Sequence, residues 1–85
     1  MAHSQATETP RQLFRRAARS AVVNRDESGN IPARANLIVT YRALDEVDRL
    51  EARIWLATER DHAKLRLDVK AARAWNEVLG RVNPH

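Results

Sequence analysis

The amino-acid sequence predicts an all-α protein, in which a short basic N-terminal helix packs on a long antiparallel helical hairpin of coiled-coil character. Apolar residues recur at spacings of three and four from Leu37 onward, as they do on one side of a helix. Residues 33–79 contain no glycine or proline. A helix-start signal at Thr9 precedes the first amphipathic segment. These observations predict three helices, over residues 10–24, 32–57 and 59–79, in a single domain of residues 9–82.

The first helix is expected to follow a polar N-terminal tail, residues 1–8, which we expect to be disordered. Thr9 suits the N-cap, Pro10 the first helical position and Gln12 the third, where its amide can reach back to the cap. The apolar residues of this segment share one side at helical spacing: Leu13, Phe14, Ala17, Ala18, Ala21 and Val22.

The main loop is predicted at "NRDESGNIPARAN", where Ser28, Gly29, Asn30 and Pro32 cluster. Pro32 suits the first turn of the second helix, with Asn30 as a nearby cap. The β-branched run "LIVTY", residues 37–41, would also suit a strand. We favour helix because no second strand is available to pair with it.

The segment "IWLATERDHAKL", residues 54–65, is either the bend of a hairpin or the middle of one continuous helix. Carrying the apolar seam through it at heptad spacing places polar residues in the seam, which weakens a rod. A hairpin is favoured, with Thr58 capping a third helix and Asp61 in its first turn. The missing glycine counts against a tight turn here, and the continuous helix remains the alternative.

Folding the chain about Glu59 predicts four contacts across the hairpin: Ile54 with Leu65, Leu50 with Val69, Val47 with Ala72, and Leu44 with Trp75. Gly80 then breaks the apolar pattern, and residues 83–85 form a C-terminal tail in which Pro84 stops the helix.

Several function classes are excluded by what the sequence lacks. It has no cysteine, so it can form no disulfide and no thiolate zinc site. Its two glycines cannot build a phosphate-binding loop or a dinucleotide fingerprint. No apolar run approaches a membrane span, and the N-terminus does not resemble a secretory signal. We expect a cytoplasmic protein that is not an enzyme and binds no metal, cofactor or small-molecule substrate.

Two candidate binding features stand out. Arg11, Arg15, Arg16 and Arg19 gather along one face of the first helix. Guanidinium groups suit phosphate or another anionic partner, although a solvated helix face explains the pattern at least as well. Trp55 lies off the central apolar line, on the side of Leu37 and Tyr41. It is either an exposed binding hot spot or, as we favour, covered there by the third helix.

An acidic patch lies around Val47 and Leu50 and comprises Asp45, Glu46, Asp48 and Glu51. These carboxylates point in several directions around a helix, so a solvated face is favoured over a metal or catalytic site. The patch could also meet the arginine-rich helix, in the same molecule or in a neighbour.

The predicted function is a small helical interaction module, such as an adaptor, regulator or assembly factor, that acts by protein–protein contacts. A second copy of the chain is one expected partner, and the oligomeric state is left open. The net charge of +4 supports an alternative, a nucleic-acid-binding regulatory or packaging protein. The abundance of arginine and alanine suggests a GC-rich genome, such as that of an actinobacterium or its phage.

Overall fold

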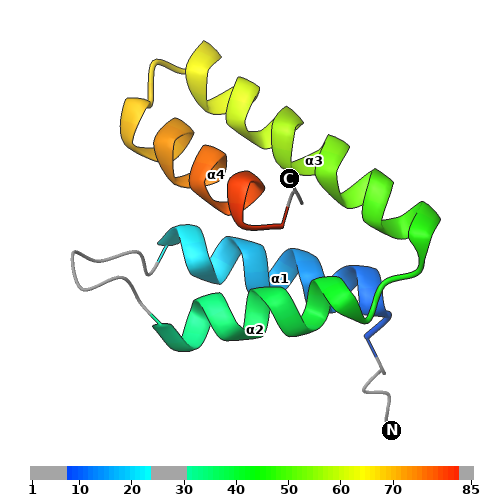
Figure 1. Ribbon diagram of the computed structural model, residues 1–85. Coiled ribbons are helices and arrows are strands. Elements are labelled where there is room, and N and C mark those ends of the chain that lie inside the picture. The colour runs from blue at the N-terminus through cyan, green and yellow to red at the C-terminus, as the bar shows by residue number, and fades with distance from the viewer. Residues whose placement is uncertain (1–7, 24–30, 83–85) are drawn as a thin grey trace, which may run out of the picture.

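The computed structural model describes residues 8–23 and 31–82, and the described chain is helical apart from short turns. The helices are α1 (Pro10–Val23), α2 (Ile31–Arg42), α3 (Glu46–Leu65) and α4 (Val69–Val82) (Figure 1). The predicted all-α class is confirmed, and the described ranges contain no strand. The predicted C-terminal tail, most of the N-terminal tail and most of the main loop lie outside the described residues.

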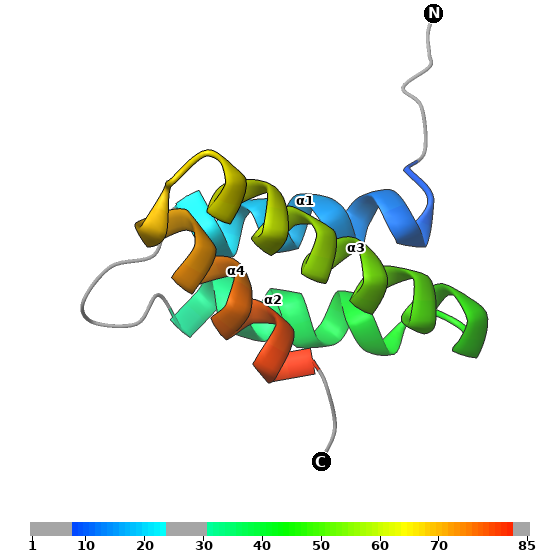
Figure 2. The same ribbon diagram turned by 90° about the horizontal axis from the view of Figure 1, so that it is seen from above.

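The helices form two antiparallel pairs. α1 lies beside α2, and α3 lies beside α4 (Figures 1 and 2). α4 contacts all three other helices, so it joins the two pairs, and α1 also reaches α3. This arrangement leaves the side of α3 that points away from α4 without a neighbouring helix among the described residues.

The start of α1 agrees with its sequence signal. The Thr9 N–H donates to Gln12 Oε1 at 2.9 Å, and the Gln12 N–H donates to Thr9 Oγ1 at 3.2 Å. These two bonds are a reciprocal capping box, which satisfies backbone donors that the first helical turn would otherwise leave unpaired. The predicted roles of Thr9 and Gln12 are therefore confirmed.

The predicted second helix, 32–57, is wrong because the chain turns at residues 43–45. The Leu44 N–H bonds to the Tyr41 carbonyl at 3.1 Å, which tightens the end of α2, and the Arg42 carbonyl accepts from Arg49 Nη2 at 2.9 Å. Asp45 has extended backbone angles, and its carboxylate accepts from the Asp48 N–H at 2.8 Å. An aspartate N-cap thus starts a new helix without any glycine or proline.

The predicted turn about Glu59 is also wrong, since α3 continues through Thr58 and Asp61 to Leu65. The Thr58 hydroxyl does not cap a helix; it donates to the Ile54 carbonyl at 2.9 Å, a bond typical of threonine inside a helix. The predicted antiparallel hairpin does form, between α3 and α4, but its turn lies at residues 66–68. The predicted third helix, 59–79, therefore begins ten residues later, at Val69.

The turn between α3 and α4 is a Schellman motif built without glycine. The Asp68 N–H donates to the Ala63 carbonyl at 2.9 Å, and the Leu67 N–H donates to the Lys64 carbonyl at 3.0 Å. Leu67 has φ 60°, the left-handed conformation that this motif usually assigns to glycine. Asp68 then caps α4, accepting from the Ala71 N–H at 3.1 Å.

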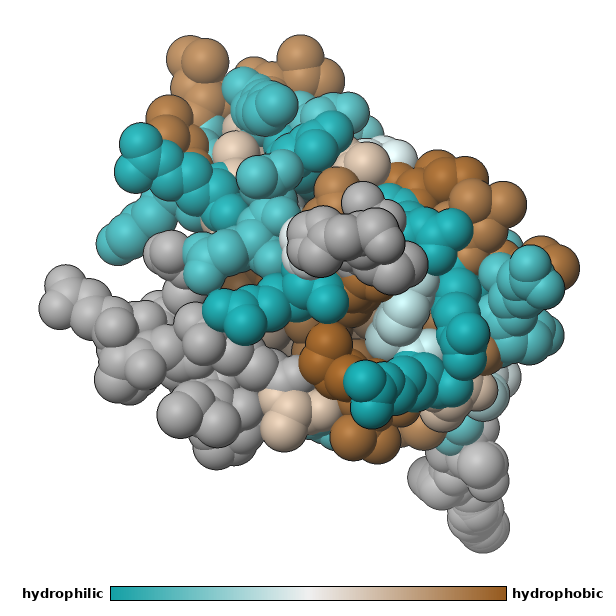
Figure 3. Space-filling model, viewed as in Figure 1, coloured by the Kyte–Doolittle hydropathy of each residue, from teal (hydrophilic) through white to brown (hydrophobic). Residues whose placement is uncertain are grey.

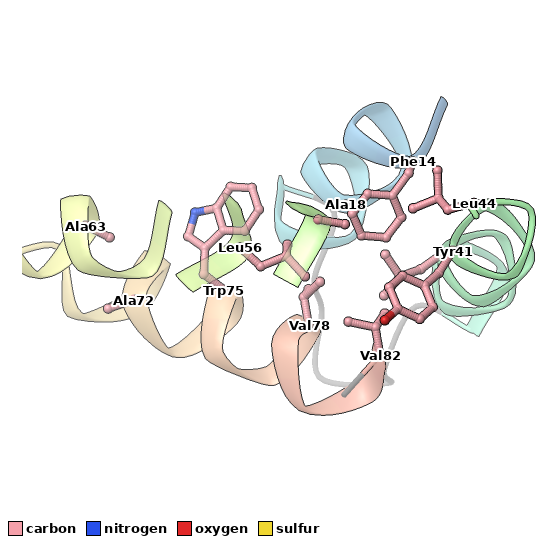
Figure 4. Close-up of a cluster of buried hydrophobic side chains, with 12 residues drawn as sticks. Phe14, Ala18, Tyr41, Leu44, Leu56, Ala63, Ala72, Trp75, Val78 and Val82 are labelled. Carbon is pink, nitrogen blue, oxygen red and sulfur yellow. The ribbon is translucent and has the colours of Figure 1, made fainter. Parts of the chain in front are cut away.

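The core lies where the two helix pairs meet (Figure 4). Phe14 of α1, Leu37 of α2 and Leu56 of α3 are its largest fully buried side chains. The rings of Phe14 and Tyr41 lie 5.7 Å apart and are tilted, which suits an aromatic pair. Ala63 and Ala72 are buried near the hairpin turn, where small side chains let α3 and α4 approach closely.

The four contacts predicted across a hairpin about Glu59 are not supported. Leu44, Ala72 and Trp75 are buried, but the other five residues of the predicted seam are exposed: Val47, Leu50, Ile54, Leu65 and Val69. The cause is the turn at residues 43–45, because a new helix beginning at Asp45 turns a different side of the chain toward the core. That side carries Ala52, Leu56 and Ala63.

Candidate interaction surfaces

The arginine-rich face of α1 meets the acidic patch of α3 in the same molecule. Arg11 Nη2 bonds to the Glu51 carboxylate, and Arg11 Nε lies 3.9 Å from Asp48 Oδ1. Arg15 Nη2 lies 3.7 Å from the same Glu51 carboxylate. One of the two arrangements left open for the acidic patch, contact with the arginines within one molecule, is therefore the one found.

Trp55 is half-buried at the junction of three helices. Its ring packs edge-on against Phe14 of α1, with ring centroids 6.4 Å apart, and against Trp75 of α4, with ring centroids 5.4 Å apart. The guanidinium carbons of Arg15 and Arg19 lie 5.1 Å and 5.5 Å from its ring centroid, a cation–π arrangement. Trp55 is therefore covered in part by α4, which falls largely within the predicted third helix, and in part by α1, which was not expected there. Its role as a partner-binding hot spot stays a prediction.

Three members of the predicted arginine site are exposed, Arg11, Arg16 and Arg19, and Arg15 is half-buried. Arg16 bonds to the Glu8 carboxylate at the start of α1. A shallow depression of about 350 Å³ is lined by Glu8, Gln12, Arg15, Arg16 and Arg19. Three guanidinium groups thus lie together, one of them neutralised in part by Glu8, and phosphate binding there stays a prediction.

The outer face of α3 is an apolar surface that sequence reasoning assigned to the core. Val47, Leu50 and Ile54 lie on one side of the helix at spacings of three and four, with exposed fractions of 73%, 53% and 59%. Leu65, the last residue of α3, continues this side. In the space-filling view, hydrophobic surface gathers along α3 (Figure 3). We call these four residues the outer stripe of α3.

A signal for this surface was present in the sequence. α3 carries two apolar sets, the outer stripe and the set of Ala52, Leu56 and Ala63, which fall on opposite sides of a helix. A helix that is apolar on two sides buries one side in its own core and offers the other to a neighbour. Recognising Asp45 as an N-cap would have shown that one helix holds both sets.

The tip of the α3–α4 hairpin is a second exposed apolar feature. Leu65, Leu67 and Val69 are exposed there on alternate residues around the turn. Hydrophobic surface is visible at this tip in Figure 3. Sequence reasoning placed Leu65 and Val69 in a buried seam and therefore missed it.

The described residues offer no group of three or more histidine, aspartate and glutamate side chains placed to hold a metal ion. In the same part of the chain, none of the helices combines the length and the apolar character needed to span a bilayer. Comparisons with protein-family models, with curated proteins and with solved structures returned no match to this chain.

Proposed function

We propose that this protein is a small non-enzymatic interaction module that acts by protein–protein contacts through the outer stripe of α3. The observation that carries the proposal is the exposure of Val47, Leu50 and Ile54 in line on one helix. Burying a leucine or isoleucine side chain contributes about 1.5–3 kcal/mol, so a helix that covers this stripe gains substantial free energy. A row of exposed apolar residues such as Val47, Leu50 and Ile54 marks an interaction site more often than scattered single residues do.

A second copy of the chain is the partner that the charge layout favours. The stripe is bordered by Glu46 and Glu51 near the start of α3 and by His62 and Lys64 near its end. If two α3 helices pair antiparallel about their midpoints, Val47 of one copy faces Leu65 of the other. Glu46 then lies beside Lys64 of the second copy, and a two-fold axis makes each of these contacts twice.

Thr58 and Asp61 also fall on this side of α3 and interrupt the stripe. Asp61 Oδ1 accepts from Arg60 Nε at 3.2 Å, so its carboxylate is already partly compensated. Polar positions in a helical seam lower stability but restrict the register in which two helices can pair. The expected dimer is therefore a weak one with a defined register.

Sedimentation equilibrium across a wide concentration range tests the dimer. The wild-type chain should approach twice its 9.7 kDa mass, and Ile54→Asp should stay monomeric with unchanged helical content. Val39→Asp is the matched control, because Val39 is an exposed apolar residue on α2, outside the stripe. It should associate as the wild type does.

A charge exchange tests the register. Glu46→Lys alone should weaken the dimer, because two lysines then meet, and Glu46→Lys with Lys64→Glu should restore it. A wild-type chain that is monomeric at every concentration, or an Ile54→Asp variant that dimerises normally, would contradict self-pairing through this face.

The second candidate function is nucleic-acid binding by Arg11, Arg15, Arg16 and Arg19. The depression lined by three of these arginines favours it. Against it, Glu51 engages Arg11 and Arg15, and Glu8 engages Arg16. A gel shift with duplex DNA at low salt separates the two functions. Binding that falls steeply with salt and disappears when Arg15, Arg16 and Arg19 are all changed to alanine would favour nucleic acid.

A further inference from the structure

A groove at the turn end of the α3–α4 hairpin combines an apolar floor with a cationic rim. Its volume is about 370 Å³, enough for one or two side chains of a partner. Its lining comprises Leu67, Val69, Ala72 and Asn76 with three charged residues, Arg60, Lys64 and Arg73. Every charged side chain that lines the groove is therefore a cation, and we call this site the tip groove.

The backbone conformation of Leu67 is a second observation that indicates a binding site at the tip groove. It adopts φ 60°, a conformation that costs an L-residue free energy and that glycine adopts without a steric penalty. Its side chain is 86% exposed, so no burial within the described chain compensates that cost. A strained backbone that holds an apolar side chain out at the edge of a groove is the kind of local conflict found at binding sites.

We propose that the tip groove binds an acidic amphipathic segment of a partner protein. An apolar side chain of that segment enters between Leu67, Val69 and Ala72. Its carboxylates meet the rim cations, among them Lys64 and Arg73, which are the exposed ones. This site lies at the end of the hairpin, goes beyond the self-pairing of α3 and does not depend on it.

A lipid surface fits this site less well than a protein segment. The Asp68 carboxylate lies between Leu67 and Val69 in sequence and caps α4. Inserting the tip into a bilayer would take that carboxylate out of water, which is costly. A segment that enters the groove avoids this cost, because Asp68 does not line it.

Nucleic acid also fits less well, because phosphates would satisfy the rim and leave the apolar floor uncovered. Arg60 is in addition partly engaged, since it donates to Asp61 and, at 3.2 Å, to Asn76 Oδ1. An acidic segment with an apolar anchor matches both the floor and the rim.

Fluorescence anisotropy with a labelled synthetic peptide tests the proposal. The probe carries leucines at helical spacing and glutamates elsewhere, and its counterpart carries lysines in place of the glutamates. The glutamate peptide should bind the wild-type chain and the lysine peptide should not. Leu67→Gly, which keeps the turn and removes the side chain, should weaken binding roughly tenfold. Arg73→Glu should weaken binding as well, and the binding that remains should depend less on salt concentration.

Ile54→Asp is the control that separates the tip groove from the outer stripe of α3. At a dilution where the wild type is monomeric, this variant should bind the glutamate peptide as the wild type does. Loss of peptide binding in Ile54→Asp would assign the peptide to α3 and overturn the tip groove. A wild-type chain that ignores the glutamate peptide, or a Leu67→Gly variant that binds it equally well, would also overturn it.

Anionic phospholipid vesicles and duplex DNA complete the test. If either binds the wild type, loses binding in Leu67→Gly and competes with the peptide, the site belongs to that ligand and the protein-segment proposal is wrong. Absence of a Leu67-dependent signal with both supports the proposal.

Discussion

The two faces of α3 are both apolar, but one is buried and the other is exposed to solvent. The inner face places Ala52, Leu56 and Ala63 in the core, and Leu56 is fully buried. The outer face presents Val47 and Leu50, among others, to solvent. The outer face carries four apolar residues and the inner face three. The inner residues nevertheless form the core, because the caps at both ends of the helix fix which side meets α4. Apolar periodicity thus identifies a stripe, and helix ends decide where that stripe points.

The largest expected effect comes from making the same substitution on the two faces. Leu56→Ala should lower the free energy of unfolding by about 3 kcal/mol, because it removes a fully buried side chain and leaves a cavity. Leu50→Ala should change it by less than about 0.5 kcal/mol at a dilution where the chain is monomeric. Urea denaturation followed by circular dichroism measures both. Equal losses in the free energy of unfolding would contradict the assignment of one buried and one exposed face.

The helix ends that orient α3 and α4 give the next largest effect. Asp45→Ala and Asp68→Ala should each cost about 1 kcal/mol, since each removes a carboxylate that accepts from a backbone N–H. Thr58→Ala should stay within about 0.5 kcal/mol of wild type, because Thr58 lies inside a helix that alanine favours. Thermal unfolding distinguishes these results. A cost for Thr58→Ala like that of a lost cap would place the turn where the sequence first suggested it.

Leu67 offers a smaller effect of opposite sign. Leu67→Gly should raise the free energy of unfolding by about 0.5 kcal/mol, as relief of the left-handed strain exceeds the added chain entropy of glycine. Leu65→Gly, two residues earlier at the end of α3, should instead lower it by about 0.5–1 kcal/mol. Chemical denaturation of both variants checks the pair, and a destabilised Leu67→Gly would show that the turn conformation is misassigned.

The smallest effect concerns the ion pairs that join α1 to α3. Glu51→Gln removes the carboxylate shared by Arg11 and Arg15 and should cost less than about 0.5 kcal/mol at low salt. The difference from wild type should vanish at high salt, because exposed pairs are screened. Unfolding measured at two salt concentrations tests this, and a loss that persists at high salt would mean that Glu51 packs as well as pairs.

The parts of the fold that the sequence could predict are those with a local mechanism. The capping box of Thr9 and Gln12 acts within one turn of helix, so the local sequence is enough to predict it. The all-α class followed from periodicity and from the scarcity of glycine and proline. The meeting of the arginines with the acidic patch was one of two arrangements that the charge pattern allows, whereas the contribution of α1 to covering Trp55 was not expected.

The turns could not be placed because their usual marker is missing. Leu67 takes the left-handed position that glycine normally holds, and tertiary packing of α3 on α4 sustains it. Asp45 and Asp68 are both caps, but an aspartate among other charged residues gives a weak signal without knowledge of its backbone. Because these turns were misplaced, the wrong side of α3 was predicted to face the core. The exposed outer stripe was therefore assigned to the core, and the tip groove was missed.

Thiol labelling tests the central claim about α3 most directly, because the natural chain has no cysteine to interfere. Ala63→Cys on the inner face should react at least about a hundredfold more slowly than an unfolded thiol, since the core must open first. Ile54→Cys on the outer face should react like a free thiol in dilute solution and become protected as concentration rises. A protected thiol at position 54 in the monomer, or an open one at position 63, would contradict the account.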